Sequence, residues 1–273
     1  MNIDIDKVAS AIRDVAATEI LPRWRNLAAG DIQEKTGPQD LVTIADQAAE
    51  KALSAKLLSL YPETVVVGEE GVEADPSKMD LFKQNQPIWV IDPIDGTMAF
   101  AGGKPEFDVM LALTQNHSLD AGWIYSPVQD DMYFATREHG AMRIHKKAQA
   151  QKLSAPTIHG IKNYTGILGN KLLSKEHRDF VKSQEPKFTK IYSSISAGHD
   201  YAMLMRGEAQ FAVYGKCMPW DHLPGLTMLS CLGFVYCKHD GSAYVPGDTT
   251  GGLIIAPNKS ALDEIRAIVM AMH

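Results

Sequence analysis

The stretch Trp89-Val-Ile-Asp-Pro-Ile-Asp-Gly-Thr97 runs from an apolar segment directly into two carboxylates, a proline and a glycine. Pro93 biases Asp92 toward an extended backbone, and Gly96 permits a sharp turn or a close approach of a ligand to the main chain. The two carboxylates can therefore converge on one point. Because Mg2+ prefers hard oxygen ligands, two carboxylates, a carbonyl and a hydroxyl from one turn indicate a partial metal shell. The backbone N–H groups of Gly96 and Thr97 would suit a phosphate.

Acidic residues also stand at the ends of two other predicted elements. Gly68-Glu69-Glu70 ends the preceding strand, and Trp220-Asp221 opens a helix in the second half of the chain. Ordinary alternatives exist, because Asp-Pro and Asp-Gly pairs are typical of solvated turns, and Asp221 is suited to be an N-cap with Pro224 in the first turn. Acids at three such ends, in a protein without clusters of basic residues, favour a site for more than one metal ion.

Composition bounds the class of protein and its partners. The 273-residue chain is 45% hydrophobic and 22% charged. Its length and hydrophobic content are enough to form the core of one large domain or of two ordinary ones. A net charge of -6 disfavours nucleic acid as a partner and would repel a phosphate ester, so local positive charge is needed, which bound metal ions can supply. The three cysteines form no CxxC pair, which indicates a reducing compartment. The first residues are acidic and no stretch is long enough to span a membrane, so we expect a cytoplasmic protein that does not bind a membrane.

Residues 1–155 predict an N-terminal α+β domain with an antiparallel sheet and most of the metal ligands. An amphipathic helix is expected from Ile3 to about Leu27, and a polar loop over Gln33–Gln39. Asp46 is expected to cap the next helix, which Tyr61-Pro62 ends. Strands are expected at Thr64–Val67, Ile88–Ile91, Phe107–Thr114, Ala121–Tyr125, Met132–Ala135 and Ala141–Ile144. The last four suggest an antiparallel meander.

Residues 156–273 predict a C-terminal α/β domain that contributes Asp221 and a substrate loop, because strands and helices alternate there. Strands are expected at Lys190–Ser194, Ala209–Tyr214, Phe234–Lys238 and Leu253–Ala256. Helices are expected at His199–Met205, at Asp221–Leu232 and from about Ser260.

Other phosphate and hydrolase chemistries lack their signatures. Gly102-Gly103-Lys104 is followed by Pro105, so a nucleoside triphosphate P-loop is disfavoured. Phosphatases that form an aspartyl-phosphate usually place their two aspartates one residue apart, whereas two residues separate Asp92 from Asp95, and covalent catalysis is therefore the second choice. No HExxH pair or GxSxG elbow occurs, and His222 is expected at the surface or behind the ligands.

Two segments, Asp92-Pro-Ile-Asp-Gly-Thr97 and Trp220-Asp-His-Leu-Pro-Gly225, resemble the two signatures of the inositol monophosphatase family, the lithium-sensitive, magnesium-dependent sugar phosphatase superfamily. Gly68-Glu-Glu70 stands in the expected place before them. Lys35 and the segment Asp40-Leu-Val-Thr-Ile-Ala-Asp46 are similar to the family's early loop and helix start. The resemblance implies a five-layer αβαβα sandwich, commonly a homodimer, that acts as a phosphoric monoester hydrolase.

The resemblance also implies a division of roles. The implied ligands of two to three Mg2+ ions are Glu69, Asp92, the Ile94 carbonyl, Asp95, Thr97 and Asp221. The first ion would bind Glu69, Asp92, the Ile94 carbonyl and Thr97. The second would bind Asp92, Asp95 and Asp221. A third, more weakly bound ion would contact Glu69.

The implied catalytic residues are Asp46, Glu69 and Thr97. Asp46 and Thr97 would orient and deprotonate a metal-bound water that attacks phosphorus in line, while the second ion stabilises the leaving alkoxide. The implied substrate contacts are Asp95, Gly96, Thr97, Ser196, Ala197, Tyr214 and Asp221.

The substrate side departs from the inositol-specific pattern. Typical inositol phosphatases have Gly-Ser/Thr-Ala where this chain reads Ile195-Ser196-Ala197, and a glutamate that binds inositol hydroxyls where this chain has Tyr214. Losing that acceptor weakens selection for a ring of free hydroxyls. We therefore expect a small sugar or polyol phosphate, with inositol monophosphate, histidinol phosphate, fructose 1,6-bisphosphate and nucleotide 3'-phosphates as open candidates. The alternative from another class is a regulatory relative that acts by binding a protein partner. The intact metal-binding positions argue against this alternative.

Overall fold

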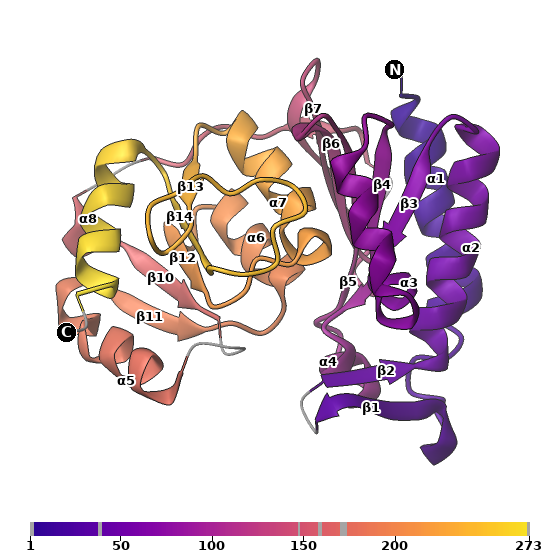
Figure 1. The fold of residues 1–273 in the computed structure, drawn as a ribbon, viewed down its shortest axis with the longest axis horizontal. Coiled ribbons are helices and arrows are strands. Elements are labelled where there is room, and N and C mark those ends of the chain that lie inside the picture. The colour runs from indigo at the N-terminus through magenta and orange to yellow at the C-terminus, as the bar shows by residue number, and fades with distance from the viewer. Residues whose placement is uncertain (1–2, 38–39, 147, 158–159, 170–173, 272–273) are drawn as a thin grey trace.

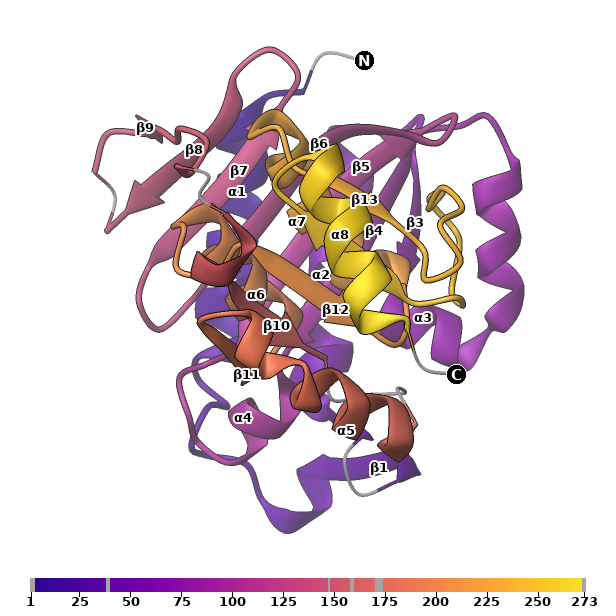
Figure 2. The same cartoon turned by 90° about the vertical axis from the view of Figure 1, so that its left-hand side faces the viewer.

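The computed structural model describes residues 3–37, 40–146, 148–157, 160–169 and 174–271. Its helices and sheets alternate in five layers, so the predicted αβαβα sandwich is confirmed (Figure 1). The three helical layers are α1 (Ile5–Val15) with α2 (Ile44–Leu60), α6 (Ala197–Met205) with α7 (Pro219–Cys231), and α5 (Lys175–Ser183) with α8 (Lys259–Val269). Figure 2, turned by 90°, places α5 and α8 nearest the viewer. Within the described ranges, no helix is long and apolar enough to cross a membrane.

The opening helix is shorter than expected. After α1 the chain continues as a short π-helix, Ala16–Ile20, and then turns at Leu21-Pro22, because proline has no N–H with which to continue a helix. The predicted apolar face is buried against the neighbouring layers through Val8, Ile12, Val15 and Ile20.

The larger sheet has seven strands in the order β3-β4-β5-β6-β7-β8-β9. The strands are β3 (Val65–Gly68), β4 (Ile88–Asp95), β5 (Asp108–Gln115), β6 (Ser118–Ser126), β7 (Asp131–Thr136), β8 (Gly140–His145) and β9 (Gln151–Lys152). Only the β3–β4 pair is parallel among these described strands, and the predicted antiparallel meander is confirmed in β5 to β8. β4 continues through Asp92 to Asp95, so the acidic motif lies within the strand.

Two expectations for the segment before α2 are wrong. Most of the predicted loop over Gln33–Gln39 is strand, because Ile32–Gly37 forms β1 and pairs with β2 (Asp40–Thr43); residues 38 and 39 lie outside the described ranges. A two-stranded hairpin satisfies its own backbone, so a polar sequence gives little sign of it. Thr43, rather than Asp46, is the N-cap of α2, and Asp46 closes the capping box as the third helical residue.

The smaller sheet has five strands in the order β11-β10-β12-β14-β13. The strands are β10 (Thr165–Leu168), β11 (Lys190–Ser193), β12 (Phe211–Tyr214), β13 (Val235–Cys237) and β14 (Leu253–Ala256). The first three in spatial order are parallel, and β14 is antiparallel to both of its neighbours. β10 and α5 were not predicted, since β10 has four residues without alternation and α5 buries only Val181.

The middle layer joins the two sheets, because α6 and α7 share one buried apolar cluster with residues of both. α7 begins at Pro219 and has Met218 as its N-cap, so the prediction that Asp221 caps this helix is wrong: Asp221 is its third residue, and Pro224 lies inside the helix. The last strand of the larger sheet ends at Lys152 and β10 begins at Thr165. We retain the division between residues 1–155 and 156–273 as an interpretation of the chain.

We predict that Gly122→Ala destabilises the fold by about 2 kcal/mol, because overpacking a core contact has a cost of this size. A Cβ at Gly122 of β6 would lie 2.7 Å from the backbone carbonyl oxygen of Pro224 in α7, which side-chain rotation cannot relieve. Gly160→Ala is the matched control, because its Cβ would meet nothing within 4 Å. Chemical unfolding measures both, and equal midpoints for the two variants would contradict the close packing of α7 on β6.

Candidate active site

A β-bulge brings the two aspartates of β4 to one side of the strand. Asp92 pairs opposite Met110 and Asp95 opposite Asp108, so three residue steps on β4 match two on β5. Residues three apart on a regular strand point to opposite faces, and one extra residue restores the same face. The bulge includes Pro93, which cannot donate a ladder hydrogen bond.

Asp92 is the centre of an acidic cluster and is only 2% exposed. Burial raises the pKa of Asp92 well above its ordinary value, and the charges of Glu69, Asp95, Asp221 and Asp46 raise it further, in that order. Acids that the sequence places in four separate segments therefore gather around one buried carboxylate. Asp92 Oδ1 also accepts a hydrogen bond of 3.1 Å from the backbone N–H of Ile94.

Glu69 is positioned by a helix start that Glu50 caps. The short helix α3 (Glu69–Ala74) follows β3 without a loop. Glu50, on α2, accepts hydrogen bonds of 2.8 Å from the backbone N–H groups of both Glu70 and Gly71. Helix starts leave such N–H groups without partners, so the carboxylate fixes the place where Glu69 leaves the strand. We did not predict this role, although Glu50 lies one helical turn after Asp46 and hence on the same face of α2.

Lys35 places a buried positive charge beside the cluster. Its Nζ lies 3.0 Å from Glu69 Oε1 and 2.7 Å from Glu70 Oε1, and only 5% of its side chain is exposed. Burial opposes the charge on Lys35, but the two glutamates raise the pKa of the ammonium group above its ordinary value. Burial raises the pKa of Glu70 to about 7, and Lys35 opposes that rise. The acidic cluster therefore already binds one cation from the chain itself.

Thr97 lies between the cluster and the start of α2. Its Oγ1 is 3.0 Å from the carbonyl oxygen of Ile94 and 3.3 Å from Asp46 Oδ1. Burial raises the pKa of Asp46 to about 6, while donors from Thr43 oppose the rise. The helix α4 (Thr97–Ala101) starts after Gly96, whose φ of 91° lies in the left-handed region that favours glycine. The turn thus brings a hydroxyl, a carbonyl and a buried carboxylate together.

The N-terminus of α6 meets the cluster from the other half of the chain. Ser196 is the N-cap of this helix, and the backbone N–H of Gly198 donates a 2.5 Å hydrogen bond to Asp95 Oδ2. A carboxylate at a helix N-terminus is favoured by the helix dipole. Ser196 and Ala197, both predicted substrate contacts, are largely buried at 6% and 9% exposure.

Tyr214, a predicted substrate contact, is hydrogen-bonded within the protein. It is 5% exposed, and its hydroxyl donates to Asp200 Oδ2 at 3.1 Å, where the hydroxyl of Ser194 also donates at 2.5 Å. Burial raises the pKa of Asp200 to about 8, which these donors oppose. Sequence reasoning did not identify the role of Asp200, because an acid in the first turn of a helix is common.

His222, beside Asp221 on α7, is buried rather than at the surface, so that part of the expectation is wrong. Its Nε2 lies 3.2 Å from the carbonyl oxygen of Lys216, which only accepts, and its Nδ1 lies 3.0 Å from the hydroxyl of Tyr201. The imidazole therefore donates from Nε2 and accepts at Nδ1. Burial lowers the pKa of His222 to about 4, so the ring is neutral and connects α7 to α6.

The donor set fits Mg2+ in its chemistry, since carboxylate, carbonyl and hydroxyl oxygens are the ligands that this ion prefers. In the described part of the chain, no three His, Cys, Asp or Glu side chains already form an arrangement that holds a metal ion. Several of the carboxylate oxygens take other partners instead, namely Lys35 for Glu69 and backbone N–H groups for Asp92 and Asp95. Each of these carboxylates has a second oxygen and further lone pairs that could contact a metal ion.

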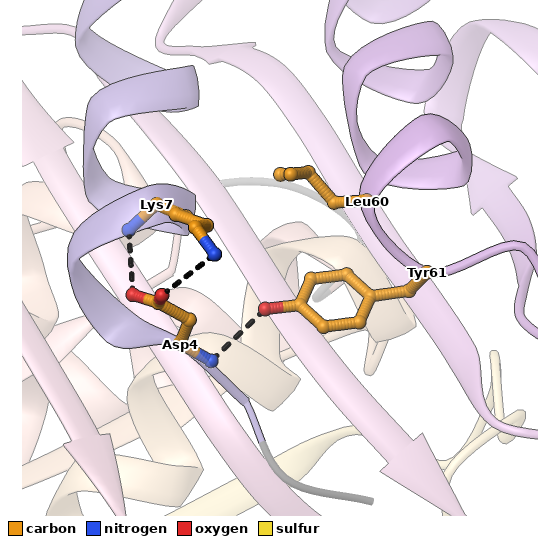
Figure 3. Close-up of a pocket in the computed structure, with 4 residues that line it drawn as sticks. All are labelled: Asp4, Lys7, Leu60 and Tyr61. Carbon is orange, nitrogen blue, oxygen red and sulfur yellow. Dashed lines mark hydrogen bonds and ion pairs between the residues drawn. The ribbon is translucent and has the colours of Figure 1, made fainter.

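A separate surface pocket lies at the far end of α2 and contains no part of the acidic cluster. Asp4, Lys7, Leu60 and Tyr61 line it, and Figure 3 shows the Asp4 carboxylate bonded to Lys7 and the Asp4 N–H bonded to the Tyr61 hydroxyl. Because a helix rises about 1.5 Å per residue, Tyr61 lies about 20 Å along α2 from Asp46. We assign it no part in the chemistry of the cluster.

A model of the inositol monophosphatase family matches residues 2–271. The chain belongs to this family. Its members are phosphatases, so the protein is a phosphoric monoester hydrolase.

Individual relatives agree with this placement. A fructose-1,6-bisphosphatase/inositol-1-monophosphatase of Thermotoga maritima is 25% identical over 217 residues, which cover 77% of this chain and 76% of the relative. An inositol-1-monophosphatase of Bacillus subtilis is 27% identical over 245 residues, which cover 88% of each chain. A solved IMPase/NADP phosphatase in complex with Mg2+ and phosphate has a TM-score of 0.80 at 19% identity, covering 97% of this chain and 94% of that one. At that identity the structure supports the fold alone.

We predict that Glu50→Ala weakens the attachment of Glu69 to the cluster. Because the two N–H groups are only half-buried, leaving them without this partner should cost about 1 kcal/mol of stability. If Glu69 is a metal ligand, its displacement should also raise the Mg2+ concentration needed for half-maximal phosphate release. Glu73→Ala, which removes an exposed acid from α3, is the control. The measurement is phosphate release by both variants as a function of Mg2+ concentration. An unchanged Mg2+ requirement in Glu50→Ala would mean that Glu50 does not position Glu69.

Proposed function

We propose that the protein is a Mg2+-dependent phosphomonoesterase that hydrolyses inositol monophosphate or a related small sugar or polyol phosphate. The observation that carries this proposal is the gathering of Glu69, Asp95, Asp221 and Asp46 around the buried Asp92. Packing alone does not explain why five acids lie together, because like charges in a buried place repel one another strongly and this raises the free energy of the folded state. Divalent cations relieve that repulsion and attract an anionic ester to an acidic protein.

The proposed metal ligands are Glu69, Asp92, the Ile94 carbonyl, Asp95, Thr97 and Asp221, for two to three Mg2+ ions. Bound Mg2+ supplies Lewis acidity, which lowers the pKa of water and offsets charge on the phosphate. A solved structure of the same fold, an IMPase/NADP phosphatase, is complexed with Mg2+ and phosphate, and our proposal assigns the same ion to this chain.

The chain's own groups hold the substrate and move the proton. Asp46 Oδ1 lies 3.3 Å from Thr97 Oγ1, so a proton taken up at the Thr97 hydroxyl can pass to a carboxylate that α2 holds in place. The N–H groups of Gly96 and Thr97 are the proposed donors to the phosphate oxygens. Glu69, the third proposed catalytic residue, joins the same cluster from α3. Proton transfer by positioned groups of this kind accounts for rate factors of about 10²–10⁴.

The substrate class follows from relatives and from the polar contacts near the site. The Thermotoga relative is named for fructose 1,6-bisphosphate and inositol 1-phosphate, and the Bacillus relative for inositol 1-phosphate. The pairing of Tyr214 with Asp200 removes two polar side chains from those that could bind substrate hydroxyls, so strict selection for inositol is not expected. Histidinol phosphate and nucleotide 3'-phosphates stay in the substrate panel. A homodimer, lithium sensitivity and a cytoplasmic location stay predictions.

We predict that Asp92→Asn abolishes phosphate release, by at least about 10³-fold, because the central proposed ligand of two ions is lost. Removal of metal by EDTA should have the same effect on the unaltered protein, and added Mg2+ should restore it. Thermal unfolding with and without Mg2+ gives a second measurement: the ion should stabilise the unaltered protein and not the variant. Asp6→Asn, an exposed acid on α1, is the control.

Turnover of any panel ester by Asp92→Asn, or in excess EDTA, would contradict the metal mechanism. Failure of the unaltered protein to hydrolyse any ester with Mg2+, together with stable capture of a protein partner by Asp92→Asn, would favour the regulatory alternative instead.

A further inference from the structure

A loop of the smaller sheet crosses α7 and reaches the other half of the chain. Residues 238–252 connect β13 to β14, and Figure 1 shows them passing in front of α7. The backbone N–H of His239 donates to the carbonyl oxygen of Gly251 at the base of the loop. An ion pair of 3.1 Å joins Lys238 to Asp248. The loop is therefore fixed by its own contacts, and we call residues 238–252 the strap.

The middle of the strap packs against the segment that follows α3. A Cβ built on Gly247 would lie 2.9 Å from the Cβ of Phe82, so the strap backbone lies directly on this side chain. Phe82 belongs to the 3-10 helix Pro76–Lys83, which contacts α3, the helix that begins with Glu69. Tyr244, also in the strap, is buried in the apolar cluster that includes Phe82 and residues of α7. The strap thus contacts both halves of the chain.

The end of the strap is bonded to the turn that leads into α7. The buried thiol of Cys217 donates a 2.9 Å hydrogen bond to the carbonyl oxygen of Thr250. Burial raises the pKa of this thiol to about 11, so it keeps the proton that it donates. The same turn is bonded to the first turn of α7, because Nε2 of His222 donates to the carbonyl oxygen of Lys216 at 3.2 Å. The strap, the turn and the start of α7 are therefore linked.

Asp221 lies in this first turn of α7 and close to the strap. It is the third residue of the helix, directly before His222. Burial raises the pKa of Tyr244 well above its ordinary value, and several nearby groups, Asp221 among them, raise it further. Asp221 also raises the pKa of Asp92, so it lies between the acidic cluster and a buried side chain of the strap. A shift of the start of α7 would move Asp221 with it.

We propose that the strap positions Asp221 as a ligand of one Mg2+ ion, with Cys217 as the positioning residue through which it acts. This role rests on the phosphomonoesterase function proposed above, in which Asp221 binds the second ion and not the first. Because a metal ligand must be held close to its productive position, freeing the turn before α7 should weaken the second ion alone. A packing defect elsewhere in the core would not single out one ion.

Cys217→Ala and Cys217→Ser form the matched pair, because their side chains are nearly equal in volume and only serine can donate to Thr250. Calorimetric titration with Mg2+ alone measures the first two binding steps without turnover, and Asp221→Asn identifies the second step by losing it. We expect Cys217→Ala to weaken this step by about ten-fold, and Cys217→Ser to stay within about two-fold of the unaltered protein. Cys237→Ala, which removes a buried thiol from the cluster under α5 and α8, is the control and should change neither step.

Thermal unfolding of each variant without Mg2+ checks that the fold is retained. Equal affinity of Cys217→Ala and Cys217→Ser for the second ion, or equal weakening of both ions, would overturn the role of the strap and leave the proposed function standing. Mg2+ binding that depends on the Cys217 donor, in a protein that hydrolyses no ester, would instead support the strap and overturn the proposed function.

Discussion

Mutual repulsion among the carboxylates around Asp92 is the constraint on which the rest of the site depends. Two unit charges 4 Å apart in a protein environment repel by about 4 kcal/mol, so side chains free to move would separate. The chain prevents this through backbone features: the bulge that turns Asp92 and Asp95 to one face, the Glu50 cap that fixes the start of α3, and the Gly198 N–H that bonds Asp95. Lys35 supplies the compensating charge nearest to Glu69.

The strand β4 can hold Asp92 in place because it is buried on both faces. Side chains alternate along β4, so Trp89 and Ile91 join the apolar cluster under α1 and α2, while Ile88 and Val90 join the cluster under α6 and α7. The parallel neighbour β3 delivers Glu69 beside it, and the antiparallel neighbour β5 sets the register of the bulge. Movement of the β4 backbone would disturb both cores, so the position of Asp92 depends on the whole fold.

Much of the fold was predictable because its strongest signals are local. The apolar run before Asp92, the alternating strands of the meander and the amphipathic face of α1 each identify an element without tertiary information. The β1–β2 hairpin, β10 and α5 were missed because polar or very short elements are stabilised by pairing and docking that periodicity does not report. Helix starts were misplaced at Asp46 and Asp221 for a similar reason: an acid at the third helical position and an acid at the N-cap look alike in sequence, and only backbone geometry separates them.

The roles of two residues that support the site, Glu50 and Asp200, could not be predicted from the sequence. Glu50 and Asp200 are acids on helices, and nothing in their neighbours distinguishes them from solvated side chains, yet both are buried and bond backbone or hydroxyl groups next to the cluster. Their burial follows from the packing of α2 and α6 against the sheets, which is set by residues far away in the chain. The same packing buries Asp200 and leaves Ile195, five residues earlier, exposed, so burial changes within one turn of the start of α6 and cannot be inferred from residue type alone.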